Sequence, residues 1–238
     1  IGHSQFAWDI RQNSKIVNVF SKIWNVNNED LLTSFDAITF HIPPEITQIG
    51  FHDESRSWWH TDQAPNNKEF SCIQGIVMLY DVNKGDATLR VLEESSKYHQ
   101  ELFEWNGVKK NNNWYEYSKK DKVFLYEKGC KPVNVLAKAG DLILWDSRTA
   151  HYGMGPLKER SKKNIRAGVY VCMTPRYLID EENLIRKQTA LKNMEMTTHW
   201  PHKIKTFKKY TKKYEIVPNI AELPKPILTN LGLKLAGF

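Results

Sequence analysis

Three residues combine two imidazoles with one carboxylate, which is the donor set of a non-haem iron site. His60 and Asp62 stand two positions apart after a Trp-Trp pair, and His151 follows a strand-like run that ends in Trp145-Asp146. Such a set occupies one face of an octahedral Fe(II) ion and leaves three positions open. An oxygenase needs these positions, two for a chelating co-substrate and one for O2. The pattern therefore predicts an oxygenase centre with His60, Asp62 and His151 as metal ligands.

The strength of this prediction comes from the context of the three residues. A His-x-Asp pair arises by chance in roughly one such chain in two or three, and a lone histidine is more often structural. On an extended segment, side chains two apart point to the same side, so His60 and Asp62 can share one ion. Arg166 then opens an apolar run downstream of His151, where a cation can hold a dicarboxylate. The three candidate ligands and Arg166 agree in order, spacing and local structure, and this agreement favours the metal site over a chance pattern.

The other histidines carry less information. His199 and His202 form a His-x-x-His pair, but Pro201 between them disfavours the regular helix that would align the two rings. We interpret both as structural or surface residues, together with His3, His41, His52 and His99.

Length and composition indicate one domain with a sizeable core. The chain has 238 residues, of which 41% are hydrophobic and 26% charged. We expect a single domain over residues 1–238, with a β core at about 34–175 and a helical, basic region at about 176–238. No run approaches the roughly 18 apolar residues that a membrane span requires.

The cysteines favour a reducing compartment. Cys72, Cys130 and Cys172 are odd in number and show no CxxC spacing, so we expect buried free thiols in an intracellular, cytoplasmic protein. The first residue is Ile1 and not methionine, so an earlier targeting segment is not excluded.

The net charge of +7 is concentrated near the C-terminus. Lysines crowd the stretch Lys203–Lys213, with aromatic residues between them. Such a stretch can contact a polyanion, such as a nucleic acid, a phosphorylated ligand or an acidic protein surface. A solvated helix face is the commoner explanation.

Hydrophobic spacing and turn signals predict many short strands with a few helices. The expected fold is mostly β with flanking helices around a double-stranded β-helix core, the jelly roll of cupins. The expected helices cover residues 13–25, 95–105 and 180–194, with a short helical turn at 28–32 and a surface loop at 109–122. The expected strands lie within residues 34–42, 70–82, 87–92, 133–136, 141–145 and 166–173.

Several of these segments together resemble a known family. The carrying residues are His60-Thr-Asp62, the segment 85–97, the segment 141–151 and Arg166. Over residues 34–175 the chain resembles the Fe(II)/2-oxoglutarate-dependent dioxygenases, and among them the phytanoyl-CoA dioxygenase-like branch. The chain departs from that branch at residues 93–96, which lack its usual Pro-Gly.

The resemblance implies roles for particular residues. His60, Asp62 and His151 would bind Fe(II), and Arg166 would pair with the distal carboxylate of 2-oxoglutarate through its planar fork. Gln74 falls where relatives place a side chain beside the co-substrate. By strand alternation alone, the hydroxyl of Thr149 is a further candidate for contact with it.

Two features of the site remain open in the sequence. Arg160 is a rival for the carboxylate clamp, but it lies in the polar loop 158–163 rather than on an apolar strand. Trp58, Trp59 and Trp145 either wall the site or belong to the core.

The resemblance also implies an activity. It is the hydroxylation of an unactivated C–H bond of a small molecule, with O2 and 2-oxoglutarate consumed and succinate and CO2 released. Because Asp62 is present, hydroxylation is favoured over halogenation. Two alternatives stay open: hydroxylation or demethylation of a macromolecule docked on Lys203–Lys213, and a non-catalytic jelly-roll binding module. The substrate and the oligomeric state are not determined.

Overall fold

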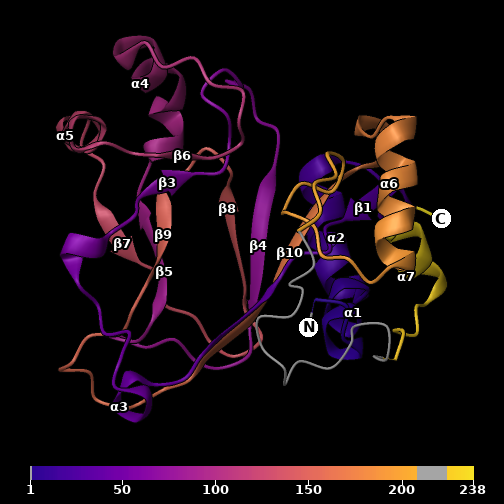
Figure 1. The fold of residues 1–238 in the computed structure, drawn as a ribbon, viewed down its shortest axis with the longest axis horizontal. Coiled ribbons are helices and arrows are strands. Elements are labelled where there is room, and N and C mark those ends of the chain that lie inside the picture. The colour runs from indigo at the N-terminus through magenta and orange to yellow at the C-terminus, as the bar shows by residue number, and fades with distance from the viewer. Residues whose placement is uncertain (1, 208–223) are drawn as a thin grey trace. The chain divides into compact units, whose positions relative to one another are not determined.

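The computed structural model describes residues 2–207 and 224–238 (Figure 1). The chain divides into two compact units. The first contains Ile1–Thr39, Cys72–Val77 and Val169–Phe238, and the second contains Phe40–Ser71 and Met78–Gly168. The single domain predicted over residues 1–238 stays a prediction.

The helices of the first unit begin and end at residues that the sequence marks. They are α1 (Gln5–Arg11), α2 (Ser14–Trp24), α6 (Glu181–Lys192) and α7 (Asn230–Leu235). The side chain of Asn13 caps α2 by accepting a hydrogen bond from the backbone N–H of Lys15, and Asn25 ends this helix in the left-handed conformation. Asp180 caps α6 in the same way. The helices predicted at residues 13–25 and 180–194 are therefore confirmed.

The strands of the first unit surround the long strand β10 (Arg166–Pro175), whose C-terminal part belongs to this unit. It lies between β1 (Leu31–Thr33) and β4 (Ile73–Met78), and its pairing with β1 is antiparallel. The helical turn predicted at 28–32 is shorter than expected. A 3-10 turn covers Asn28–Asp30, and Leu31 already pairs with β10 because the buried leucines continue into the sheet.

Two buried groups of the first unit stand out. The sulfur atoms of Cys72 and Cys172 lie 3.2 Å apart, and both thiols are free and buried. Lys187 is fully buried on α6, where its ammonium donates to the carbonyl of Thr33 and lies 4.2 Å from the centre of the Phe35 ring.

The second unit contains a five-stranded antiparallel sheet of order β6-β3-β9-β5-β7. Its pairing places His60 of β3 opposite His151 of β9, and His151 also pairs with Val91 of β5. The sheet therefore brings together two histidines that lie far apart in the sequence. Its strands are β3 (His60–Thr61), β5 (Thr88–Leu92), β6 (Tyr115–Glu116), β7 (Pro132–Asn134) and β9 (His151–Met154).

The loop predicted at residues 109–122 is wrong in its second half. Strand β6 lies there, and helix α5 (Lys119–Glu127) begins at a capping box in which Ser118 and Asp121 bond to each other's backbone N–H groups. The Ser-x-x-Asp spacing was a visible signal for this helix. Its lysine-rich first turn hid the apolar residues Phe124 and Leu125, which enter the core with Trp59, Leu92, Leu102, Phe103, Tyr117 and Tyr152.

The remaining elements of the chain are short. Helix α4 (His99–Asn106) follows a 3-10 turn at Ser95–Tyr98 and confirms the helix predicted at 95–105. The others are β2 (Ile38–His41), α3 (Pro44–Thr47), β8 (Leu142–Asp146) and 3-10 turns at Glu54–Arg56 and Arg176–Leu178. The strand-rich architecture with flanking helices confirms the predicted fold class. Within the described part of the chain, every helix is too short or too polar to span a membrane.

Candidate metal centre

The three predicted ligands lie together in the second unit. Oδ2 of Asp62 is 3.7 Å from Nε2 of His60 and 3.2 Å from Nε2 of His151. One donor atom from each residue lies within 4.8 Å of the other two, and the two imidazole rings are 4.4 Å apart between centres. The structure therefore gathers two imidazole nitrogens and one carboxylate oxygen at a spacing that one metal ion can span.

Backbone carbonyls orient both imidazoles. Nδ1 of His60 is 3.1 Å from the carbonyl oxygen of Trp58, and Nδ1 of His151 is 2.8 Å from that of Thr149. A carbonyl only accepts, so each Nδ1 must carry the proton, which leaves the lone pair of each Nε2 for a metal. Metal-binding histidines are usually held in this way. By this test the residues fit a divalent metal ion.

Asp62 is positioned by the turn that precedes β9. Its backbone N–H donates to the carbonyl of Ser147 at 3.1 Å, and the hydroxyl of Thr61 donates to the same carbonyl at 2.9 Å. The hydroxyl of Ser147 in turn donates to the side chain of Gln63 at 2.7 Å. These bonds join the loop that carries Asp62 to the turn that leads into His151.

Tryptophan side chains surround the two histidines. Trp58 stacks on the His60 ring at 4.4 Å with an interplanar angle of 4°, and Trp145 lies 5.5 Å from the His151 ring. Trp59 instead is buried in the core.

The sequence did not single out Trp114, which is 6.1 Å from His60 and lies in the expected surface loop. Its aromatic character in an asparagine-rich stretch was the only signal.

Arg166 lies beside the strand that carries His151. It is the first residue of β10 and is buried, and a Cβ atom added to Gly153 would lie 3.5 Å from its Nη1 atom. Gly153 follows His151 by two positions on β9, so both positions share one face of that strand. Burial, and after it the charge of Arg166, lowers the pKa of His41. The guanidinium therefore lies on the same side of β9 as His151.

The rival arginine has a different environment. The side chain of Arg160 is only 1% exposed, although its loop neighbours are exposed. Its Nη2 and Nε atoms donate to the carboxylate of Glu45 at 2.6 and 3.1 Å, and Nη1 is 3.7 Å from Asp86. The hydrogen bond from Arg160 lowers the pKa of Glu45. Two carboxylates of the chain therefore already engage this guanidinium.

The roles predicted for the other site residues stay predictions. Gln74 is buried on β4 in the first unit, and its place beside the co-substrate stays a prediction. Thr149 contributes its carbonyl to His151, while the role of its hydroxyl stays a prediction. In the basic stretch Lys203–Lys213, Lys203 and Lys205 are exposed, and residues 208–213 lie outside the described residues.

The remaining histidines support the structural interpretation. His3 contacts the carbonyl of Glu195 at 2.8 Å, and His202 contacts the hydroxyl of Thr174 at 3.0 Å. Burial lowers the pKa of His3, His99 and His202 to about 4, so these rings are neutral at pH 7. In residues 2–207 and 224–238, the His60, Asp62 and His151 set is the one group with metal-ligand spacing.

Two imidazoles and one carboxylate, with both rings oriented by the backbone, form a donor set that fits one non-haem metal ion. The family of phytanoyl-CoA dioxygenase (PhyH) matches residues 3–162, which is more than half of the chain. The chain therefore belongs to the phytanoyl-CoA dioxygenase family.

Individual proteins are similar to this chain at lower identity. "Ava biosynthesis cluster protein O" from Aspergillus versicolor is 26% identical over 211 residues, which are 85% of this chain and 65% of that protein. This chain thus spans slightly less than two thirds of that relative. The epimerase SnoN in complex with Fe3+, alpha ketoglutarate and nogalamycin RO covers 72% of this chain and 59% of its own, at 12% identity and a TM-score of 0.46. The match with AviO1 from Streptomyces viridochromogenes Tue57 covers 70% of this chain and 59% of AviO1, at 13% identity and a TM-score of 0.43.

Proposed function

We propose that this protein is an Fe(II)- and 2-oxoglutarate-dependent dioxygenase that hydroxylates an unactivated C–H bond of a small molecule and releases succinate and CO2. The observation that carries the proposal is the grouping of His60, Asp62 and His151 with both imidazoles oriented through Nδ1. Membership of the phytanoyl-CoA dioxygenase family supports it.

The residues of the chain have separate tasks in this proposal. Bound Fe(II), with 2-oxoglutarate and O2, supplies the oxidising chemistry. His60 and His151 would hold the ion through Nε2, because the backbone carbonyls that accept from Nδ1 fix both rings in that orientation. Asp62 contributes a negative charge, which favours binding of a metal cation at the site. Arg166 would pair with the distal carboxylate of the co-substrate, because a guanidinium keeps its charge and its planar shape suits a carboxylate.

Exposed aromatic surface supports a small-molecule substrate. Trp58 and Trp114 remain 44% and 42% exposed although both lie beside the His60 ring. Large exposed aromatics at a reactive centre offer an apolar surface on which a substrate can displace water. The alternative, a macromolecular substrate docked on Lys203–Lys213, draws no support from the described part of that stretch.

An anaerobic titration tests the proposal. Fe(II) is added to the full chain, then 2-oxoglutarate, and the visible spectrum is recorded. We expect the weak metal-to-ligand charge-transfer band of the chelate, followed by succinate release in a substrate screen. If iron binds but the band does not form, Arg166 is not a working clamp and a 2-oxoglutarate-independent enzyme replaces the proposal. If iron does not bind, the chain is a non-catalytic binding module.

A further inference from the structure

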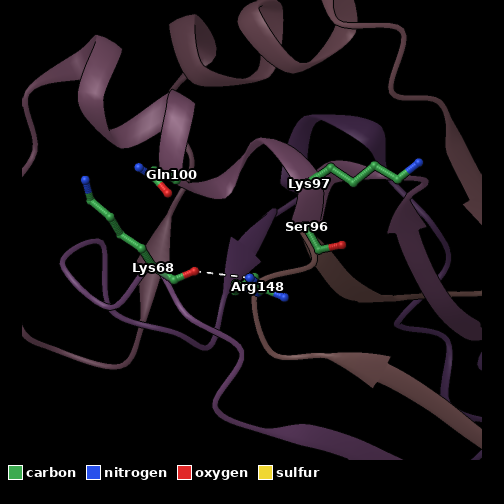
Figure 2. A pocket seen from close by; sticks show the side chains of 5 residues that line it. All are labelled: Lys68, Ser96, Lys97, Gln100 and Arg148. Atoms are coloured by element: carbon green, nitrogen blue, oxygen red, sulfur yellow. Dashed lines mark hydrogen bonds between the residues drawn. The ribbon is translucent and has the colours of Figure 1, made fainter.

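The second unit has a surface pocket whose lining does not include the three candidate metal ligands, and it indicates a second binding site. It has a volume of about 170 Å³ and is lined by Lys68, Ser96, Lys97, Gln100 and Arg148 (Figure 2). Each of the five side chains can donate hydrogen bonds, three of them are cationic, and none of the five is acidic. The lining therefore has the chemistry of an anion site.

Arg148 is the fixed part of this pocket. Its Nε and Nη2 atoms donate to the carboxylate of Asp146 at 3.0 and 2.7 Å, and its Nη1 atom donates to the carbonyl of Lys68 at 3.1 Å, the bond drawn in Figure 2. A guanidinium has five N–H groups, so these contacts leave two for a ligand. Because Asp146 and the backbone hold the group, little side-chain entropy is lost when a ligand binds.

The two lysines are the adjustable part. Lys68 is paired with Glu104 at 2.5 Å and Lys97 with Glu94 at 2.6 Å, and the lysine side chains are 40% and 64% exposed. Exposed ion pairs of this kind contribute little to stability, and an ammonium group has three N–H donors. Both lysines can therefore turn toward an anion at little cost.

The number of donors selects the kind of anion. Once the lysines turn away from Glu104 and Glu94, two ammonium groups, the two unused N–H groups of Arg148 and the hydroxyl of Ser96 exceed what one carboxylate can satisfy. The amide of Gln100 already donates to Glu104 at 2.9 Å. A phosphate monoester carries a charge of about −1.5 to −2 and three strong acceptor oxygens. We propose that the pocket lined by Lys68, Lys97 and Arg148 binds the phosphate group of a phosphorylated small molecule. The proposal does not depend on the proposed dioxygenase activity.

The position of Arg148 gives such binding a structural consequence. Arg148 lies in the turn between Ser147, which accepts the bond from Asp62, and Thr149, which accepts the bond from His151. Lys68 belongs to the loop that follows Asp62. A bound phosphate would therefore add a bridge between the two segments that hold the metal ligands.

Calorimetric titration of the full chain tests the site with defined probes. We expect saturable binding of inorganic phosphate and tighter binding of glycerol 3-phosphate, with glycerol alone inert. The double variant Lys68→Gln, Lys97→Gln should weaken phosphate binding about tenfold or more. Lys120→Gln, at an exposed lysine of α5, and Arg166→Gln should leave it unchanged, which separates this pocket from the 2-oxoglutarate clamp. Circular dichroism verifies that each variant is folded.

Several results would overturn the proposal. They are the absence of saturable phosphate binding, equal binding by the double variant, and acetate binding as tightly as phosphate. Binding of free phosphate without binding of glycerol 3-phosphate would overturn the assignment to a phosphorylated small molecule and leave a site for the free ion.

Discussion

Nδ1 of His151 lies 2.8 Å from the carbonyl oxygen of Thr149, the residue two positions before it. His60 repeats this arrangement with Trp58, at 3.1 Å. Each histidine is thus oriented by the backbone that leads into its strand, which no side-chain substitution removes. The same local arrangement before β3 and before β9, combined with the pairing of His60 opposite His151, directs both Nε2 atoms toward Asp62.

The two contributions of Thr149 can be separated by mutation. Thr149→Val keeps the carbonyl that orients His151 but removes the hydroxyl, so iron affinity should stay within about twofold of the parent protein. If the hydroxyl contacts 2-oxoglutarate as predicted, the affinity for this co-substrate should fall about three- to tenfold, the range of one neutral hydrogen bond. Anaerobic titrations of Fe(II) and of 2-oxoglutarate measure the two effects. Unchanged co-substrate affinity would exclude the hydroxyl.

Asp62 should be essential for the metal. Asp62→Ala removes the only charged donor of the three and leaves two neutral imidazoles, so Fe(II) affinity should fall about 100-fold or more and 2-oxoglutarate turnover should be lost. Asp53→Ala, at an exposed aspartate that caps a 3-10 turn, is the matched control and should bind iron normally. Normal Fe(II) binding by Asp62→Ala would falsify the ligand assignment.

Arg166 should act on the co-substrate and not on the metal. Arg166→Ala should raise the 2-oxoglutarate concentration needed for half-saturation by about tenfold or more, since a charge-assisted hydrogen bond is lost, while Fe(II) binding persists. Gly153→Leu tests the same role from strand β9. A Cβ at position 153 would lie 3.5 Å from Nη1 of Arg166, so a leucine side chain would displace the guanidinium. We expect a similar loss, measured by the charge-transfer titration. A loss of iron binding in either variant would contradict this division of roles.

Arg160 should matter for stability instead. Its guanidinium is buried against Glu45 and Asp86, so Arg160→Ala removes the cation that both carboxylates face and should lower the midpoint of thermal unfolding by about 3–8 °C. The 2-oxoglutarate affinity of the folded variant should be unchanged. An unchanged unfolding midpoint together with weakened 2-oxoglutarate binding would make Arg160, and not Arg166, the clamp.

Lys187 should make stability depend on pH. Burial, and then the charges of Arg11 and Arg176, lowers its pKa from 10.5 to about 7. Between these two values the unfolded chain holds a proton that the folded chain lacks. The free energy of unfolding should therefore rise with pH across this range, by at most about 1.4 kcal/mol per pH unit from this group, and show no such contribution below pH 7.

Urea unfolding at pH 7, 8 and 9 measures this effect. Lys187→Met should remove the rise while filling the same buried space with an apolar chain of similar length. Lys192→Met, at an exposed lysine of the same helix, should keep it. Identical pH slopes in the parent protein and in Lys187→Met would show that Lys187 does not titrate in this range.

Local sequence signals predicted much of the secondary structure. Asn13 and Asp180 marked helix starts because a short polar side chain can accept a hydrogen bond from the first turn. The Ser118 and Asp121 signal was equally local and was overlooked, because the surrounding lysines and asparagines looked like a loop. In each case the information lay within a few residues of the element.

The three candidate metal ligands were already visible in the amino-acid sequence, because the donor types, the two-residue spacing of His60 and Asp62 and the strand-like run before His151 are local features. The approach of His151 was decided only by the tertiary structure, since strand pairing across the sheet places it opposite His60. The same holds for Arg160, whose burial depends on Glu45 of α3 and on Asp86, both distant in the sequence. Burial and long-range pairing depend on what the rest of the chain brings to a residue, and no local pattern contains that information.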